Sequence, residues 1–292
     1  MRNARARVLG LSFVVVLTFA ATASSAHAAR AGSFVALGDS YAAGPLIPVP
    51  VKPWGCLKSS NNYGSLAQQQ LQYAAYRDAT CSGAETEDMT QSQGVSPEPN
   101  PPQFDSLSAD TRLVTLQIGG NDIGFSGIAQ DCLQTDPVSG FDASRGSPCK
   151  DRYVVDGNDE VSRRIAETGP KVAANLQGIH SRSPDAKVLL VNYSAIFPHQ
   201  GGGCWPQLPV AAGDVPWLRS KQEELNGMLA DQAAANGATL VDVYSASRGH
   251  DSCALPVIRW VEPLIPASPA APAHPNLIGM LAMRDLVVTA AQ

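Results

Sequence analysis

Short apolar segments alternate with longer helix-like segments along most of the chain, and this alternation constrains the fold more than any other feature. Five segments have the length and composition of buried strands, at residues 33–37, 76–81, 112–118, 187–193 and 238–243. Helix-like segments lie at residues 63–75, 160–183, 215–237 and 276–292, with a break or kink expected at 169–170. Strands separated by helices form βαβ units and a parallel sheet. We therefore predict an α/β fold, a three-layer α/β/α sandwich of about five parallel strands.

The first 28 residues have the pattern of a secretory signal peptide. Three arginines precede an apolar run at residues 8–21, and an Ala-His-Ala cleavage pattern ends at Ala28. The run is shorter than the about 20 residues that a membrane-spanning helix needs, so an uncleaved anchor is the less favoured interpretation. We expect residues 1–28 to be removed, and residues 29–292 to form a single domain that is secreted, extracellular and without a stable membrane anchor.

The charge of the remaining chain argues against a nucleic-acid partner. Without the three arginines of the signal, residues 29–292 carry 18 basic and 26 acidic side chains, a net charge of −8. No basic stripe is left that could follow a phosphate backbone. No heptad pattern suggests a coiled-coil partner either, so a monomer is expected.

The cysteines are expected to form disulfides rather than a metal site. All of them follow the signal, and they are Cys56, Cys81, Cys132, Cys149, Cys204 and Cys253. An even number of cysteines in an oxidising compartment indicates a disulfide framework, although sequence alone leaves many pairings open. Sequential pairing needs only loops of moderate length and is the arrangement that we favour. No Cys-x-x-Cys occurs and the histidines are scattered, so no metal or other cofactor is predicted.

Three polar motifs follow three of the predicted strands directly. Ser40 lies in GDSYAAG, Gly83 in CSGAET and Asn121 in GGNDIGF. The carboxyl ends of parallel strands meet at one edge of a sheet, so these residues should converge on one pocket. Acyl transfer needs a nucleophile and donors for a developing oxyanion. Ser40 offers a hydroxyl and a backbone N–H, Gly83 a backbone N–H and Asn121 a side-chain amide.

A serine nucleophile also needs a base, and His274 is the best candidate. His180 lies late in a predicted helix, where a histidine suits the helix C-terminus. His199 and His250 lie in loops without a supporting pattern. His274 stands in AHPNLIG immediately before the last helix, where a loop can return across the carboxyl edge of the sheet. By elimination we assign the general base to His274.

The motifs GDSYAAG, CSGAET, GGNDIGF and HPN, in this order, resemble the four blocks of the SGNH (GDSL) hydrolase superfamily. The resemblance covers essentially the whole chain after the signal, and it is strongest to the secreted actinobacterial lipase and esterase branch. It implies a flavodoxin-like fold and three sequential disulfides. It also implies Ser40 as the nucleophile, His274 as the base, and an oxyanion hole made by Ser40, Gly83 and Asn121.

One position departs from the pattern of the family. Many members have an aspartate three residues before the histidine, where this chain has Ala271. Members of the secreted lipase branch orient the histidine with a backbone carbonyl, so the resemblance implies a Ser–His dyad with the carbonyl of Ala271, or alternatively Pro272, against the ring. A carboxylate from elsewhere is the competing interpretation, and Asp251 and Glu262 are the nearest in sequence.

The sequence therefore predicts a secreted carboxylic-ester hydrolase of lipase or esterase type, which forms an acyl-Ser40 intermediate. The expected partner is an ester or lipid substrate, and the apolar loops modestly favour a fatty-acyl ester. A phospholipase A1 and a carbohydrate acetylesterase fit the same catalytic residues, because fold and catalytic set do not determine the substrate. A non-catalytic secreted binding module on the same scaffold is the alternative from a different class.

Overall fold

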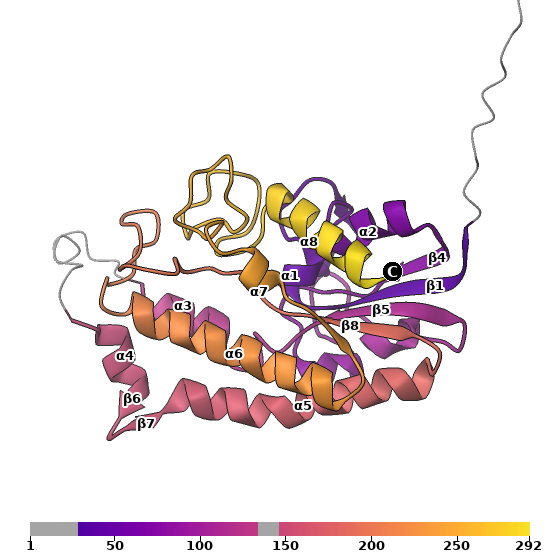
Figure 1. Cartoon of the computed structure of the whole chain (residues 1–292), viewed down its shortest axis with the longest axis horizontal. Helices are drawn as coiled ribbons and strands as arrows, with labels where there is room; N and C mark the ends of the chain where they lie inside the picture. The colour runs from indigo at the N-terminus through magenta and orange to yellow at the C-terminus, as the bar shows by residue number, and fades with distance from the viewer. Residues whose placement is uncertain (1–28, 134–145) are drawn as a thin grey trace, which may run out of the picture.

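A computed structural model gives the structure of residues 29–133 and 146–292, which are the residues described below (Figure 1). Its central feature is a parallel sheet of five strands in the order β4-β1-β5-β8-β9. The strands are β1 (Arg30–Gly38), β4 (Tyr73–Asp78), β5 (Thr111–Gln117), β8 (Lys187–Val191) and β9 (Thr239–Val241). The first of these strands lies between the second and third, which is the flavodoxin-like order. The predicted sheet is therefore confirmed.

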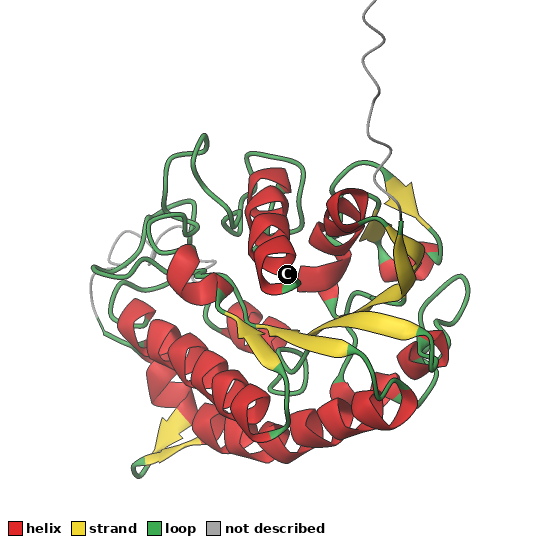
Figure 2. Ribbon diagram, turned by 45° about the vertical axis from the view of Figure 1, so that its right-hand side comes forward, coloured by secondary structure: helices red, strands yellow, loops and turns green. Residues whose placement is uncertain are grey.

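Long helices cover both faces of the sheet (Figure 2). One face carries α2 (Tyr63–Leu71) and α8 (Leu277–Ala290), and the other carries α5 (Glu160–Arg182) and α6 (Val215–Ala235). Successive strand residues point to opposite faces. Phe34, for example, packs in the core beside α2 and α8, while Val35 packs in the core beside α5 and α6. Burial on both faces explains why the inner strands β1 and β8 contain continuous apolar runs.

Shorter elements lie in the connections between these layers. The short helices are α1 (Ser40–Ala43), α3 (Phe125–Asp131), α4 (Pro148–Tyr153) and α7 (Val243–Ala246). Two-residue strands form two hairpins, β2 (Pro50–Val51) with β3 (Lys58–Ser59), and β6 (Val154–Val155) with β7 (Asn158–Asp159). Single 3₁₀ turns occupy Trp54–Cys56, Thr86–Met89 and Gln103–Ser106.

Several boundaries differ from the predictions, and the strand expected at 76–81 is β4 at Tyr73–Asp78. The helix expected at 63–75 ends at Leu71, because Gln72 adopts a left-handed conformation with φ of 54° and β4 begins at the next residue. The interruption expected at Pro170 does not end α5, which continues through it. Proline leaves the carbonyl four residues earlier without its helical donor. That residue, Ala166, is exposed, so water can bind its carbonyl.

The predicted sequential disulfides are confirmed, with pairs Cys56–Cys81, Cys132–Cys149 and Cys204–Cys253. The last pair joins the loop between β8 and α6 to the loop between α7 and α8. Within residues 29–133 and 146–292, no helix combines the length and apolar character needed to cross a membrane. The predicted signal peptide lies outside the described residues.

Candidate active site

The carboxyl ends of β1, β4 and β5 meet, as the strand order requires. Cys81 N–H donates to the carbonyl of Gly38, and Asp39 N–H donates to the carbonyl of Gln117. Asp39 is the N-cap of α1, and its Oδ1 accepts from the N–H of Tyr41 at 2.9 Å. Ser40 is the first residue of this helix, so its own N–H lies outside the helical hydrogen-bond pattern and is free to face a ligand.

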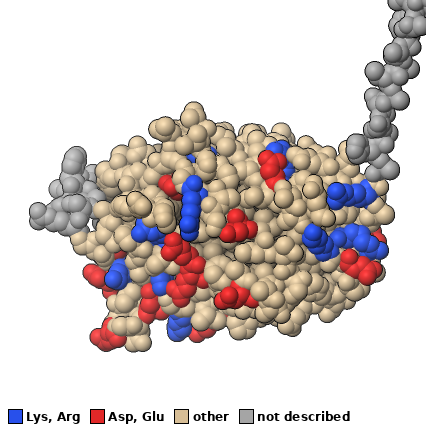
Figure 3. All heavy atoms as spheres, in the orientation of Figure 1, with Lys and Arg blue, Asp and Glu red and all other residues tan. Residues whose placement is uncertain are grey.

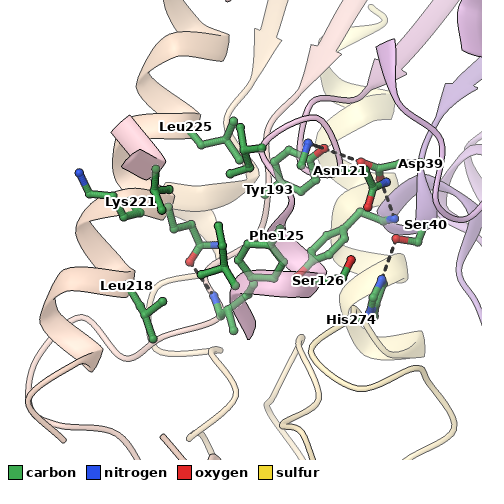
Figure 4. Close-up of a pocket in the computed structure, with 17 residues that line it drawn as sticks. Asp39, Ser40, Asn121, Phe125, Ser126, Tyr193, Leu218, Lys221, Leu225 and His274 are labelled. Atoms are coloured by element: carbon green, nitrogen blue, oxygen red, sulfur yellow. Dashed lines mark hydrogen bonds between the residues drawn. The ribbon is translucent and has the colours of Figure 1, made fainter. Parts of the chain in front are cut away.

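The structure brings Ser40 and His274 together although 234 residues separate them. The Oγ of Ser40 lies 2.7 Å from Nε2 of His274, and Nδ1 of His274 lies 2.7 Å from the carbonyl oxygen of Pro272. A carbonyl can only accept a hydrogen bond, so Nδ1 must carry the proton. Nε2 is then the lone-pair nitrogen, and the hydroxyl of Ser40 donates to it (Figure 4).

The carbonyl beside the His274 ring belongs to Pro272, which corrects the expectation of Ala271. The carbonyl of Ala271 accepts from the backbone N–H of His274 at 3.2 Å and closes a four-residue turn. Pro272 occupies the second position and Ala273 the third, with φ of 58°. Proline followed by a positive φ defines a type II turn. Because the turn uses the carbonyl of Ala271, the carbonyl of Pro272 is the one that faces the ring.

Tyr41 holds this turn in place, a role that sequence reasoning missed. Its hydroxyl donates to the carbonyl of Ala273 at 2.5 Å, and its ring centroid lies 4.9 Å from that of His274. Its place directly after Ser40 in GDSYAAG was the only signal that the sequence offered. The contact fixes His274 relative to the helix that begins at Ser40.

The two carboxylates considered as alternatives are engaged elsewhere. Asp251 accepts from the N–H of Cys253. Glu262 accepts from the Asn276 amide at 2.7 Å and from two backbone N–H groups of its own loop. Burial raises the pKa of Glu262, but these hydrogen bonds outweigh burial and hold the pKa below its usual value. Among the described residues, His274 therefore has a carbonyl rather than a carboxylate as its partner.

Asn121 lines the same cavity as Ser40 and His274. Its Nδ2 donates one hydrogen to the carbonyl of Ala84 at 2.9 Å, and a side-chain amide has a second hydrogen to offer. Gly83 precedes Ala84 and has φ of 82°, a conformation that favours glycine. The hydrogen bond between Asn121 and Ala84 thus joins the second and third motifs.

Tyr193, just after β8, is the second residue that sequence reasoning missed. Its hydroxyl donates to Oδ2 of Asp39 at 2.5 Å and accepts from the N–H of Gly120 at 2.8 Å. A Cβ at Gly120 would lie 3.0 Å from this hydroxyl, so glycine permits the close approach. Burial raises the pKa of Asp39 to about 7, although the Tyr193 hydrogen bond acts to lower it. The Tyr193 hydroxyl thereby links the loop of Asn121 to Asp39, the N-cap of the helix that begins at Ser40 (Figure 4).

A cavity of about 60 Å³ extends from Ser40 and His274 between α3, α5 and α6. Most of its walls are apolar, formed by Ile123, Phe125, Ile128, Val161, Ile196, Leu218 and Leu225. Lys221 also lines it, but its ammonium group lies 2.6 Å from Glu224 and 3.0 Å from Asp159, which neutralise its charge. The cavity therefore suits an apolar group placed beside the hydroxyl of Ser40.

Most of this chain is similar in sequence to known lipases and esterases. The profile of the GDSL-like Lipase/Acylhydrolase family matches residues 36–281. Lipase 2 of Streptomyces coelicolor is 39% identical over 282 residues, which cover 93% of this chain and 92% of the lipase. An esterase of Streptomyces scabiei is 29% identical over 269 residues, which cover 81% of this chain and 77% of the esterase.

Two solved structures share the fold. Phospholipase A1 from Streptomyces albidoflavus matches with a TM-score of 0.72 and 22% identity, over 89% of this chain and 98% of that protein. An extracellular lipase from Streptomyces rimosus matches with a TM-score of 0.72 and 23% identity, over 90% of this chain and 100% of the lipase. At these identities the similarity concerns the arrangement of helices and strands.

Proposed function

The chain belongs to the family of GDSL-like lipases and acylhydrolases, and from this premise we propose that it hydrolyses acyl esters through a covalent acyl-Ser40 intermediate, with His274 as the general base. The observation that carries the proposal is the pair of 2.7 Å contacts of the His274 ring, one to Ser40 and one to the carbonyl of Pro272. A nucleophile hydrogen-bonded to an oriented base is the arrangement that activates a serine hydroxyl.

In the first half of the reaction, Ser40 Oγ attacks the ester carbonyl while its proton moves to Nε2 of His274. The carbonyl oxygen becomes negative and is stabilised by the N–H groups of Ser40 and Gly83 and by the amide of Asn121. His274 then protonates the leaving alcohol. In the second half, His274 takes a proton from water, which attacks the acyl carbonyl. His274 then returns this proton to Oγ of Ser40 as the bond between Oγ and the acyl carbon breaks and the acid leaves. The carbonyl of Pro272 orients the ring and stabilises its cation.

The substrate class we propose is a fatty-acyl ester, in agreement with the apolar walls of the cavity. One structural relative is named a phospholipase A1 and another an extracellular lipase, so both activities are candidates for this chain. We also propose that residues 1–28 are a signal peptide and that residues 29–292 act as a secreted monomer. A hydrolysis panel of p-nitrophenyl esters, emulsified triglyceride, phosphatidylcholine and acetylated xylan distinguishes lipase, phospholipase and acetylesterase activity.

An organophosphonate tests the nucleophile directly. We expect one equivalent of label on Ser40 of the folded, oxidised protein and none on the Ser40→Ala variant, as measured by intact-protein mass spectrometry. Ser126 lines the same cavity, so Ser126→Ala is the matched control and should keep the label. A folded protein whose Ser40 remains unlabelled would favour the non-catalytic binding module.

The pH dependence should reflect the burial of the base. Burial lowers the pKa of His274 below its usual value of 6.5, although the hydrogen bond to the carbonyl of Pro272 opposes this shift. The neutral ring is the active form, so kcat/KM should fall as the pH decreases through this lowered pKa. We therefore expect the acidic limb of the profile for a soluble ester to have its midpoint below pH 6.5. NMR titration of the His274 ring provides an independent measurement, and a midpoint above that value would contradict the assignment.

A further inference from the structure

Two loops beside the active site, residues 199–213 and 252–275, expose several large apolar side chains. The set is Trp205, Leu255, Val257, Ile258 and Ile265, which we call the apolar rim. Val257 is 78% exposed and Leu255 is 68% exposed. Single exposed apolar residues are common in soluble proteins, but a group of them on neighbouring loops marks an interaction surface.

Covalent and backbone contacts hold the two loops together. The Cys204–Cys253 disulfide lies next to Trp205 in one loop and close to Leu255 in the other. The N–H of Ile265 also donates to the carbonyl of Gln207. The rim is therefore one connected surface and not a set of isolated side chains. Figure 1 shows the second loop projecting beside the beginning of α8.

The rim stands directly beside the catalytic residues. His274 belongs to the second loop, and its carbonyl accepts from the N–H of Glu262. Leu208 of the first loop and Leu264 of the second line a small void together with Phe125, which also lines the catalytic cavity. The outer side chains of the loops thus form the rim, while their inner side chains pack against the wall of the active site.

The rim carries no exposed formal charge. In residues 199–213 and 252–275 the only Lys, Arg, Asp or Glu side chains are Arg259 and Glu262. Both are buried, 4% and 0% exposed, and they lie 3.9 Å apart. In Figure 3 the projecting loops at the top are mostly tan, whereas charged side chains gather lower down and at the right. An apolar surface without charge fits the hydrocarbon and interfacial region of a lipid layer.

We propose that the apolar rim docks the protein on the surface of uncharged or zwitterionic lipid, with the active site beside that surface. The proposal rests on the proposed function, because such a surface is itself the source of the ester. The net charge of −8 for residues 29–292 disfavours an anionic layer. A stable protein partner bound to the rim would cover the loop that carries His274. A lipid surface bound to the rim would instead supply substrate next to this loop.

Vesicle flotation with phosphatidylcholine tests the rim. The Ser40→Ala variant serves as background, so that binding is measured without hydrolysis. In that background Val257→Ser and Ile265→Ser should each lower the vesicle partition coefficient about tenfold, since each removes an apolar side chain from the contact. Val155→Ser is the matched control, because Val155 is 58% exposed on β6, far from the loops in Figure 1, and its partition coefficient should not change.

Kinetics with the active serine restored provide a second readout. The rim variants should need about tenfold more emulsified triglyceride or phosphatidylcholine for half-maximal rate, while kcat/KM for soluble p-nitrophenyl butyrate stays unchanged. Unaltered vesicle binding in both rim variants would overturn the proposal. So would sedimentation showing a dimer that the rim substitutions dissociate, because the face would then bind a second copy. A protein that binds vesicles through the rim but hydrolyses no ester would refute the proposed function and leave the docking surface intact.

Discussion

Replacing Ser40 by alanine is expected to lower kcat for a soluble ester by about a millionfold, and replacing His274 by alanine should lower it by a similar factor. The two residues act as one unit, since the hydroxyl of Ser40 donates to Nε2 of His274 at 2.7 Å. Their double replacement should therefore cost little more than either single one. Steady-state hydrolysis of p-nitrophenyl butyrate by purified, oxidised protein measures all three values.

Asp251→Asn provides the control for the dyad. An enzyme that depends on a triad carboxylate loses about 10⁴-fold in kcat when that acid is replaced by its amide. Asp251 binds the N–H of Cys253 and does not contact the histidine ring, so its replacement should leave kcat nearly unchanged. A large loss for Asp251→Asn, with an unchanged melting temperature, would show that a carboxylate is needed. If the kcat losses of the single Ser40 and His274 variants instead added up in the double variant, the two residues would act independently.

Replacing Asn121 by alanine should lower kcat by about 10² to 10³-fold, the usual cost of removing one oxyanion donor. The donor acts mainly after the carbonyl oxygen becomes negative, so KM should change much less than kcat. Asn121 also binds the carbonyl of Ala84, and the alanine variant loses that contact as well.

Asn121→Asp separates the two effects of this residue. It keeps the size of the side chain, removes its N–H donors and adds a charge that repels the oxyanion. A loss at least as large as that of the alanine variant is expected. If both variants retained kcat within about tenfold, Asn121 would not serve as an oxyanion donor.

The sequence was most informative where topology alone determines position. A residue that follows a parallel strand must lie at the carboxyl edge of the sheet, so Ser40 and Asn121 could be placed near each other without coordinates. His274 precedes the last helix and reaches the same edge. The disulfides Cys56–Cys81 and Cys204–Cys253 also matched the favoured pairing, because each pairs cysteines that are consecutive in the sequence and closes a segment of moderate length.

The details that escaped prediction depend on single dihedral angles and side-chain directions. Whether Ala271 or Pro272 presents its carbonyl to the ring is decided by the positive φ of Ala273. Tyr193 ends an apolar run and resembles a core residue in the sequence, yet its hydroxyl connects Asp39 to the N–H of Gly120. No spacing rule encodes where such a hydroxyl points.

The carbonyl that faces His274 has a consequence for how this enzyme tolerates genetic change. A carboxylate partner disappears with one codon, but a peptide oxygen persists whichever amino acid occupies position 272. Alanine scanning would therefore report Ser40, His274 and Asn121 but pass over this element of the active site. Replacing the peptide bond after Pro272 by an ester, which weakens the oxygen as an acceptor, would reveal it. The effects of substitutions at residues 271 and 272 therefore do not measure how much the orientation of His274 depends on the backbone at these positions.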